Sequence, residues 1–290
     1  MRQAIRCIDP AGASLGEGPV WVADQAALFW VDIHGCRIHR FDPLSETRQS
    51  WPTPFRIGAL APRQDGGFVG ASELGFILTD ADFRHFNQLG TPEGEPPRNR
   101  FNDGKLDLHG RFWAGTMDDA EKEATGALYR LDPDLRWSRM DANYRVTNGP
   151  AFSPDGRWLY HSDSAAQSIY RFALAADGSL SGKAVFRQFG AGEGFPDGMT
   201  CDRDGCLWVA FWDGGCLRRF APDGAVLETL PLPVARPTSC AFGGENLAML
   251  FITSARVGLT DDQRAAQPLA GGLFAFGSDV PGFATPAFPF

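Results

Sequence analysis

Leu28-Phe29-Trp30-Val31-Asp32 is the first of six short aromatic and β-branched runs that recur along the chain. The other runs are Gly67-Phe68-Val69-Gly70, Arg111-Phe112-Trp113-Ala114-Gly115, Trp158-Leu159-Tyr160-His161-Ser162, Cys206-Leu207-Trp208-Val209-Ala210 and Met249-Leu250-Phe251-Ile252-Thr253. The equivalent central residues are Trp30, Val69, Trp113, Tyr160, Trp208 and Phe251. They follow one another at steps of 39, 44, 47, 48 and 43 residues. One four-stranded propeller blade occupies a repeat of this size.

The remainder of each repeat also favours strands. Segments such as residues 37–43 and 168–172 alternate in polarity with period two, as half-buried strands do. Asp-Gly pairs supply hairpin turns at Asp155-Gly156, Asp177-Gly178, Asp204-Gly205 and Asp223-Gly224. No long segment has helical periodicity. The sequence therefore predicts an all-β, six-bladed β-propeller as a single domain over residues 1–290. A strand near residues 3–8 is expected to complete the last blade. A two-sheet sandwich is the alternative, but it does not explain six copies.

Composition narrows the classes of function. The 290 residues carry a net charge of −8 with a pI near 5.1, which argues against a nucleic-acid partner. The hydrophobic fraction of 43% excludes disorder as the main state. No run approaches the roughly 20 apolar residues of a membrane span, and residues 1–16 lack a secretory signal pattern. We therefore expect no membrane association and a cytoplasmic location.

The cysteines fit a reducing compartment. The six are Cys7, Cys36, Cys201, Cys206, Cys216 and Cys240. They lack the paired CxxC spacing of a zinc–thiolate site, so we interpret them as reduced thiols. Cys201 and Cys206 flank an Asp-Arg-Asp-Gly turn, where either two free thiols, the reading that we favour, or a disulfide fits the spacing.

In four repeats a polar residue directly precedes a glycine that stands 9 to 12 positions before the central residue. The four pairs are Glu17-Gly18, Asp103-Gly104, Asn148-Gly149 and Asp197-Gly198. In a propeller these pairs begin the innermost strands and line one mouth of the central channel. Any one of them alone is typical of a turn. Together they predict a cluster of oxygen atoms suited to Ca²⁺, Mg²⁺ or Mn²⁺, with Zn²⁺ also tolerated.

Several segments together resemble the gluconolactonase/regucalcin-like (senescence marker protein-type) family of sugar lactonases. These segments are Leu15-Gly16-Glu17-Gly18-Pro19-Val20-Trp21, Arg100-Phe101-Asn102-Asp103-Gly104-Lys105, Gly115-Thr116-Met117, Gly126-Ala127-Leu128-Tyr129, Thr147-Asn148-Gly149-Pro150 and Pro196-Asp197-Gly198-Met199. The likeness runs from residue 15 to the Phe251-Ile252-Thr253-Ser254-Ala255-Arg256 segment. It implies a six-bladed propeller with one catalytic divalent cation in the channel, whether Ca²⁺, Zn²⁺, Mn²⁺, Mg²⁺ or Fe(II).

The resemblance also implies roles for single residues. Glu17, Asn148 and Asp197 match the metal ligands, and Asp197 matches the general acid/base. The substrate-binding set that it implies is Arg100, Asn102, Asp103 and Glu121. Asp103 lies beside the site and is the less secure member as a ligand. The run Asp118-Asp119-Ala120-Glu121 departs from the family pattern, so the substrate-contacting carboxylate is Asp119 or Glu121, with Glu121 favoured.

The sequence thus predicts a monomeric, divalent-metal-dependent lactonase that hydrolyses a small-molecule sugar lactone to its aldonic acid in sugar catabolism. No Gly-x-Ser-x-Gly elbow is present, so a serine-hydrolase route lacks its usual motif. A non-catalytic cation-binding scaffold and a metal-dependent hydrolase of other esters, such as phosphotriesters, are the alternatives. Arg100 with Asn102 beside the ligands favours catalysis. Among the histidines, His161 is the one considered for the channel.

Overall fold

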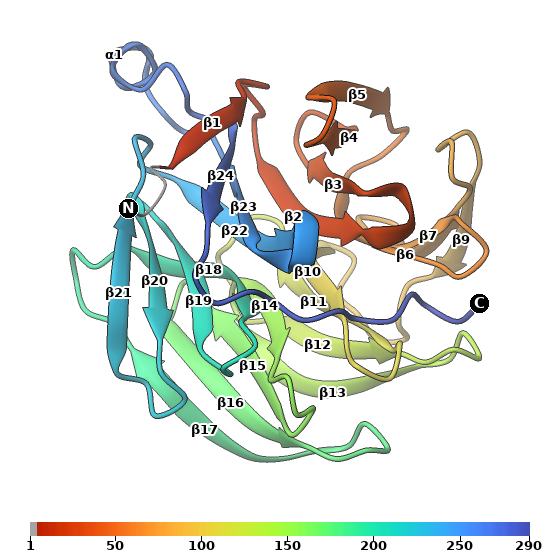
Figure 1. Cartoon of the computed structure of the whole chain (residues 1–290). Coiled ribbons are helices and arrows are strands. Elements are labelled where there is room, and N and C mark those ends of the chain that lie inside the picture. Colours follow the sequence, from red (N-terminus) through yellow and green to blue (C-terminus); the bar gives the residue numbers. More distant parts are fainter. Residues whose placement is uncertain (1–4) are drawn as a thin grey trace.

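The computed structural model describes residues 5–290, which form six four-stranded antiparallel sheets arranged in a ring (Figure 1). The innermost strands are β2 (Gly16–Val22), β6 (Ile57–Pro62), β10 (Asn99–Leu106), β14 (Thr147–Phe152), β18 (Phe195–Cys201) and β22 (Pro237–Gly243). We number blades 1 to 6 in that order. Each innermost strand contacts those of both neighbouring blades, so the ring is continuous.

The recurring hydrophobic runs form the second strand of every blade, which confirms the six-bladed prediction. These strands are β3 (Ala27–Asp32), β7 (Phe68–Ser72), β11 (Phe112–Asp118), β15 (Trp158–Asp163), β19 (Leu207–Trp212) and β23 (Met249–Ser254). The third strands are β4 (Arg37–Asp42), β8 (Gly75–Thr79), β12 (Gly126–Leu131), β16 (Ser168–Leu174), β20 (Cys216–Phe220) and β24 (Leu273–Gly277). The outer strands are β5 (Thr47–Pro52), β9 (Phe86–Gly90), β13 (Trp137–Tyr144), β17 (Leu180–Gln188), β21 (Val226–Pro231) and β1 (Arg6–Asp9).

Strand β1 closes the ring because it pairs with β24 as the outer strand of blade 6. The expected closing strand is therefore confirmed from Arg6 onward, and residues 3 and 4 of that prediction lie outside the described residues. Helices are short: α1 (Asp261–Ala266) and the 3₁₀ turns η1 (Ala23–Gln25) and η2 (Glu245–Leu247). None of the helices that residues 5–290 form is long and apolar enough to cross a membrane.

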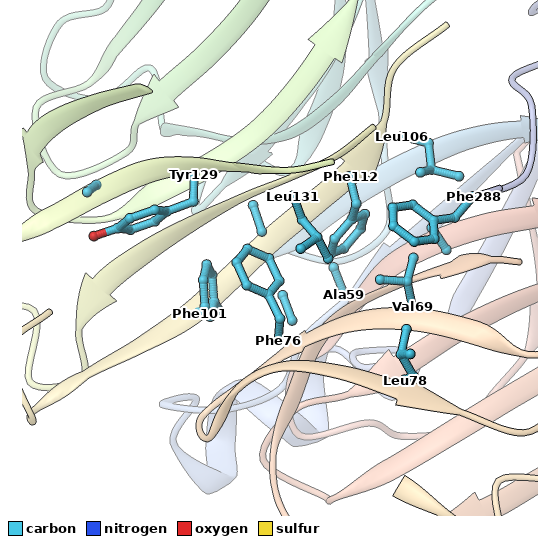
Figure 2. Close-up of a cluster of buried hydrophobic side chains, with 14 residues drawn as sticks. Ala59, Val69, Phe76, Leu78, Phe101, Leu106, Phe112, Tyr129, Leu131 and Phe288 are labelled. Carbon is cyan, nitrogen blue, oxygen red and sulfur yellow. The ribbon is translucent and has the colours of Figure 1, made fainter. Parts of the chain in front are cut away.

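Apolar side chains fill the spaces between neighbouring blades. Between blades 2 and 3, the rings of Phe76 and Phe101 lie 4.5 Å apart and Phe112 packs edge-on against Phe76 (Figure 2). Phe288, near the C-terminus, inserts into the same cluster. Burying one such aromatic side chain contributes about 1.5–3 kcal/mol. The C-terminal segment, which belongs to none of the sheets, thus contributes a side chain to the core between blades 2 and 3.

The cysteines within residues 5–290 are free, which confirms the favoured reading of two thiols at Cys201 and Cys206. Both are buried, and burial raises the pKa of each thiol. A thiol with a raised pKa is a poor nucleophile and metal ligand near neutral pH. These cysteines therefore belong to the packed interior of the blades.

Candidate functional site

Every innermost strand has a register irregularity near its start, where the polar-glycine motifs lie. The shifts fall between Glu17 and Val20, Ile57 and Ala59, Phe101 and Gly104, Asn148 and Ala151, Pro196 and Met199, and Pro237 and Ser239. A β-bulge re-aims a side chain out of the regular alternation of a strand. The bulges at the motifs found in the sequence therefore position polar side chains near the channel axis.

Glycine is required in two of these bulges, at Gly58 and Gly198, because the innermost strands crowd together there. A Cβ atom on Gly58 would lie 1.8 Å from the backbone oxygen of Asn102 in the next blade. One on Gly198 would lie 2.1 Å from Oγ of Ser239. The glycines allow the backbones to approach closely enough for four blades to contribute side chains to one place.

A cavity of about 400 Å³ opens at this mouth of the channel. Of the predicted site residues, those that line it are Glu17, Arg100, Asn102, Glu121, Asn148 and Asp197. Its volume is within the range typical of small-molecule sites. A second, smaller cavity of about 120 Å³ lies at the opposite ends of the innermost strands, next to Phe283 and Thr285 of the C-terminal segment.

Two carboxylates dominate the floor of the larger cavity. Glu17 and Asp197 are only 4% and 5% exposed. Burial raises the pKa of both groups well above the usual range, and repulsion from Asp103, and for Asp197 also from Glu17, raises the pKa values further. Oδ1 of Asp197 is buried without a hydrogen-bond partner in the described part of the chain. An ionised carboxylate in that setting needs a cation or a proton.

Asn148 supplies a third oxygen, and its amide orientation is fixed from two sides. Its Nδ2 donates to Oγ of Ser164 at 2.9 Å, and its Oδ1 accepts from Nδ2 of Asn102 at 2.9 Å. The Oδ1 atom retains a second lone pair. Within residues 5–290, no three His, Cys, Asp or Glu side chains are placed to hold a metal ion by themselves. The donor set that fits a hard divalent cation is therefore two carboxylates with one amide oxygen.

Arg100 lies beside these ligands and is held by a chain of hydrogen bonds. Its Nη1 donates to Oδ1 of Asn102 at 2.8 Å, and its Nε donates to Oδ1 of Asp119 at 2.8 Å. Asp119 accepts two further bonds from Arg56, at 2.9 and 3.1 Å, and Nε of Arg56 donates to Glu73 at 2.7 Å. These bonds use Nε and Nη1 of Arg100, whereas Nη2 donates to no group within residues 5–290.

The structure distinguishes Asp119 from Glu121, the two carboxylates that the sequence left as alternatives for contacting substrate. Asp119 and Glu121 both line the cavity. Burial alone would raise the pKa of Asp119, but the hydrogen bonds from Arg56 and Arg100 lower it. The side chain of Glu121 makes no hydrogen bond or ion pair with the described residues, and Glu121 is exposed. Glu121 is thus the carboxylate that is free to meet a ligand.

Asp103, predicted to contact substrate, is not among the residues that line the cavity. Its Oδ1 accepts from the backbone N–H of Gly104 at 2.7 Å, and its Oδ2 accepts from that of Gly149 at 3.1 Å. Burial raises the pKa of Asp103 to about 6. It braces the bulge that carries Asn148, so its contacts are those of a supporting group behind the site.

His161 does not face the channel. It lies on β15, is fully buried and packs edge-on against the ring of Tyr144, with centroids 4.8 Å apart. The expectation that it lines the channel is wrong because β15 is the second strand of its blade.

Sequence reasoning missed Arg236, which also lines the cavity. It immediately precedes β22, the innermost strand of blade 6, so the repeat register could have found it. That blade has Thr238-Ser239-Cys240 where other blades carry a polar residue and glycine, and the motif search therefore passed over it.

Comparisons with known proteins agree with the fold and show the family. The family model described as SMP-30/Gluconolactonase/LRE-like region matches residues 15–256. A 6-deoxy-6-sulfogluconolactonase from Pseudomonas putida is 40% identical over 99% of both chains. Regucalcin from Danio rerio is 38% identical over 93% of this chain and 92% of its own. The crystal structure of a calcium-binding protein, regucalcin, from Agrobacterium tumefaciens superposes with a TM-score of 0.94 at 30% identity, covering 99% of this chain and 98% of its own.

Proposed function

Because this chain belongs to the SMP-30/gluconolactonase/LRE-like family, we propose that it is a divalent-metal-dependent lactonase that hydrolyses a sugar lactone to its aldonic acid. The observation that carries the proposal is the unpartnered, buried Oδ1 of Asp197 in a cavity shared with Glu17 and Asn148. A bound cation would compensate a buried carboxylate oxygen that has no hydrogen-bond donor.

Glu17, Asn148 and Asp197 would hold the cation. Oxygen donors of this kind suit Ca²⁺, Mg²⁺ and Mn²⁺, and carboxylates also accommodate Zn²⁺ and Fe(II). When bound, such a cation supplies positive charge to a polarised carbonyl and compensates the two buried carboxylates. The Agrobacterium relative is described as a calcium-binding protein, which supports a divalent ion in this role.

Lactone hydrolysis needs a water molecule to lose a proton and the ring oxygen to gain one. Asp197 borders the cavity, and burial raises the pKa of its carboxyl, which favours proton uptake. In the proposed reaction Asp197 accepts the proton as the water oxygen bonds to the carbonyl carbon. It then returns that proton to the ring oxygen as the carbon–oxygen ester bond breaks. The product is the open-chain aldonic acid, with no other reactant consumed.

The remaining polar residues position the sugar. Arg100 presents unused N–H groups at the end of its guanidinium, and Asn102 links it to Asn148. Arg100 binds substrate oxygens and stabilises the negative charge that develops on them. Glu121, whose side chain makes no hydrogen bond or ion pair within residues 5–290, accepts hydrogen bonds from sugar hydroxyl groups.

We assign the activity to a monomer acting in cytoplasmic sugar catabolism. A propeller leaves only short edges at the outer strands of its blades, which favours a monomer. The free cysteines within residues 5–290 suit a reducing compartment. The acidic net charge fits a small-molecule substrate and not a polyanionic partner.

A cation-binding propeller without catalysis is the second candidate, because a relative bears the name of a calcium-binding protein. The Arg100–Asn102 pair argues against it. A purely structural ion gains nothing from a buried arginine held beside its ligands by Asp119 and Arg56.

The test is acid release, followed with a pH indicator, from aldonolactones and from a phosphotriester by the metal-loaded protein. We expect lactone hydrolysis above the spontaneous rate, and a loss of at least about 10³-fold in Asp197→Asn. Asp223→Asn, the same change in an exposed Asp-Gly turn, should leave the rate unchanged. A fully active Asp197→Asn protein would remove the proposed role of that residue, and faster phosphotriester turnover would reassign the substrate.

A further inference from the structure

We propose that Arg236 forms a subsite for an anionic oxygen group, such as a sulfonate, carboxylate or phosphate, at the end of the lactone remote from the reacting carbonyl. The inference rests on the proposed lactonase function and specifies its substrate class. Arg236 lines the cavity from the start of blade 6, whereas Arg100 lines it from blade 3. In a ring of six blades these two positions lie across the channel from each other.

The Arg236 guanidinium is fixed before any ligand arrives. Its Nε donates to Oδ1 of Asp213 at 2.6 Å, its Nη2 lies 3.4 Å from Oδ2 of the same carboxylate, and its Nη1 donates to the carbonyl of Val257. The group also lies over the ring of Trp212, 4.7 Å from its centroid. An arginine held in this way loses little further conformational freedom when it binds a ligand.

Two N–H groups remain for a ligand. A guanidinium has five, and the three bonds to Asp213 and Val257 use one each on Nε, Nη1 and Nη2. One hydrogen on each terminal nitrogen is therefore unused, which is the paired arrangement that two oxygens of one anionic group accept. Gly258 leaves the approach open, because a Cβ atom there would lie 2.9 Å from Nη1 of Arg236.

The charges around the cavity determine which anion fits. The acidic groups that line it are Glu17, Asp119, Glu121 and Asp197, and Arg100 is the other cation. Asp119 is paired with Arg56 and Arg100, and a bound cation would compensate Glu17 and Asp197. Because Asp213 already offsets the charge of Arg236, the subsite favours a monoanion over a dianionic phosphate.

Arg236 also ties three loops together, so a purely structural role must be tested beside the binding role. Arg218 is a matched control. Both side chains are 15% exposed and each pairs with a carboxylate that is less than half exposed. Arg218 likewise donates to a backbone oxygen, that of Glu193, and lies over an aromatic ring, that of Phe211. Arg218 is not among the residues that line the cavity.

The experiment compares metal-loaded wild type, Arg236→Gln, Arg236→Lys and Arg218→Gln on gluconolactone and on gluconolactones carrying a sulfonate, phosphate or carboxylate at C6. Wild type should favour the sulfonate or carboxylate substrate in kcat/KM. Arg236→Gln should lose about 10- to 100-fold on these substrates and less than about 3-fold on the neutral lactone. Arg236→Lys should recover part of the loss, since it keeps the charge but not the paired donors. Arg218→Gln should retain the preference.

Calorimetric titration of the four product acids into the same proteins separates failure of the inference from failure of the lactonase function. If Arg236 forms the subsite, wild type binds the sulfonated acid more tightly than gluconate, and Arg236→Gln removes the difference even if no lactone is turned over. Turnover of neutral lactone without any anionic preference in rate or binding would overturn the subsite and leave the lactonase standing. Equal losses on neutral and anionic ligands would assign Arg236 a structural role and would equally overturn it.

Discussion

Nη1 of Arg100 donates to Oδ1 of Asn102 at 2.8 Å, and this bond determines which way the Asn102 amide faces. With its oxygen turned to Arg100, Asn102 directs Nδ2 at Oδ1 of Asn148, 2.9 Å away, and at the backbone oxygen of Thr147, 2.8 Å away. The substrate-binding arginine and a proposed metal ligand are thereby parts of one hydrogen-bonded unit. Its outer end reaches Glu73 through Asp119 and Arg56.

Arg56 is accordingly a positioning residue for Arg100. We expect Arg56→Gln to lower kcat/KM for lactone about 5- to 10-fold, because Asp119 loses two of its three hydrogen bonds and holds Arg100 less firmly. Most of the loss should fall on kcat, and cation affinity measured by calorimetry should change less than about 2-fold. Arg98→Gln, which removes a more exposed arginine paired with Asp118 in the same loop region, is the control and should have no effect. A wild-type rate in Arg56→Gln would exclude the positioning role.

Glu121 and Asp119 should give different phenotypes on substitution. Glu121→Gln removes a carboxylate that makes no hydrogen bond or ion pair with the described residues, so it should raise KM about 3- to 10-fold while the melting temperature stays constant. Asp119→Asn breaks the ion pairs to Arg56 and Arg100, so it should lower both kcat and the melting temperature. Steady-state kinetics and thermal unfolding of the two variants measure these changes in KM, kcat and melting temperature. The assignment fails if Glu121→Gln leaves KM unchanged.

Removing one of the buried carboxylates should stabilise the metal-free protein. Asp197 interacts unfavourably with Glu17 and Asp103, and its Oδ1 has no donor in the described part of the chain. In the presence of a chelator, Asp197→Asn should therefore melt about 2–6 °C higher than wild type. With saturating cation the order should reverse, because the variant binds the ion less tightly. A metal-free variant that melts below wild type would show that repulsion between Asp197 and the neighbouring carboxylates does not destabilise the protein.

His161 should make the fold sensitive to acid. Burial lowers its pKa from 6.5 to about 3, and neither ring nitrogen has a hydrogen-bond partner within residues 5–290. The unfolded chain therefore binds the proton more readily, so this contribution to stability is complete above pH 6.5 and is lost as the pH falls toward 3. Between pH 7 and pH 5 the loss amounts to about 2 kcal/mol.

His161→Phe should abolish that part of the acid sensitivity while keeping the edge-on packing against Tyr144. Urea unfolding at pH 7 and pH 5 measures it, with His109→Phe, a change at a histidine in an exposed turn, as the control. An unchanged pH dependence in His161→Phe would place the titrating group elsewhere.

The blade count and most of the cavity lining could be predicted from the sequence because both depend on local pattern. The repeat of Trp30, Trp113 and their equivalents sets the blades, and the register of the polar-glycine pairs places Glu17, Asn148 and Asp197 at one mouth. Asn102 and Asp103 are a case that the sequence pattern could not resolve. They are neighbours within one bulge, and only the register shift decides that Asn102 lines the cavity while Asp103 binds backbone N–H groups behind it.

Contacts between distant segments were also beyond the sequence. The bond from Arg56 to Asp119 joins residues 63 positions apart, and no motif pointed to Arg56 as the partner of Asp119. Arg236 reaches the cavity from a blade whose bulge has no glycine. Such side chains are brought together by the packing of neighbouring blades, which no single repeat encodes.

The central claim is that a divalent cation held by Glu17, Asn148 and Asp197 is required for lactone hydrolysis. The most direct measurement strips the protein with a chelator and then assays gluconolactone hydrolysis after adding Ca²⁺, Mg²⁺, Mn²⁺, Zn²⁺ or Fe²⁺ singly. The account predicts no hydrolysis above the spontaneous rate in the stripped protein, and recovery with at least one cation at a stoichiometry of one per chain. Undiminished hydrolysis by a protein shown to be free of metal would contradict it.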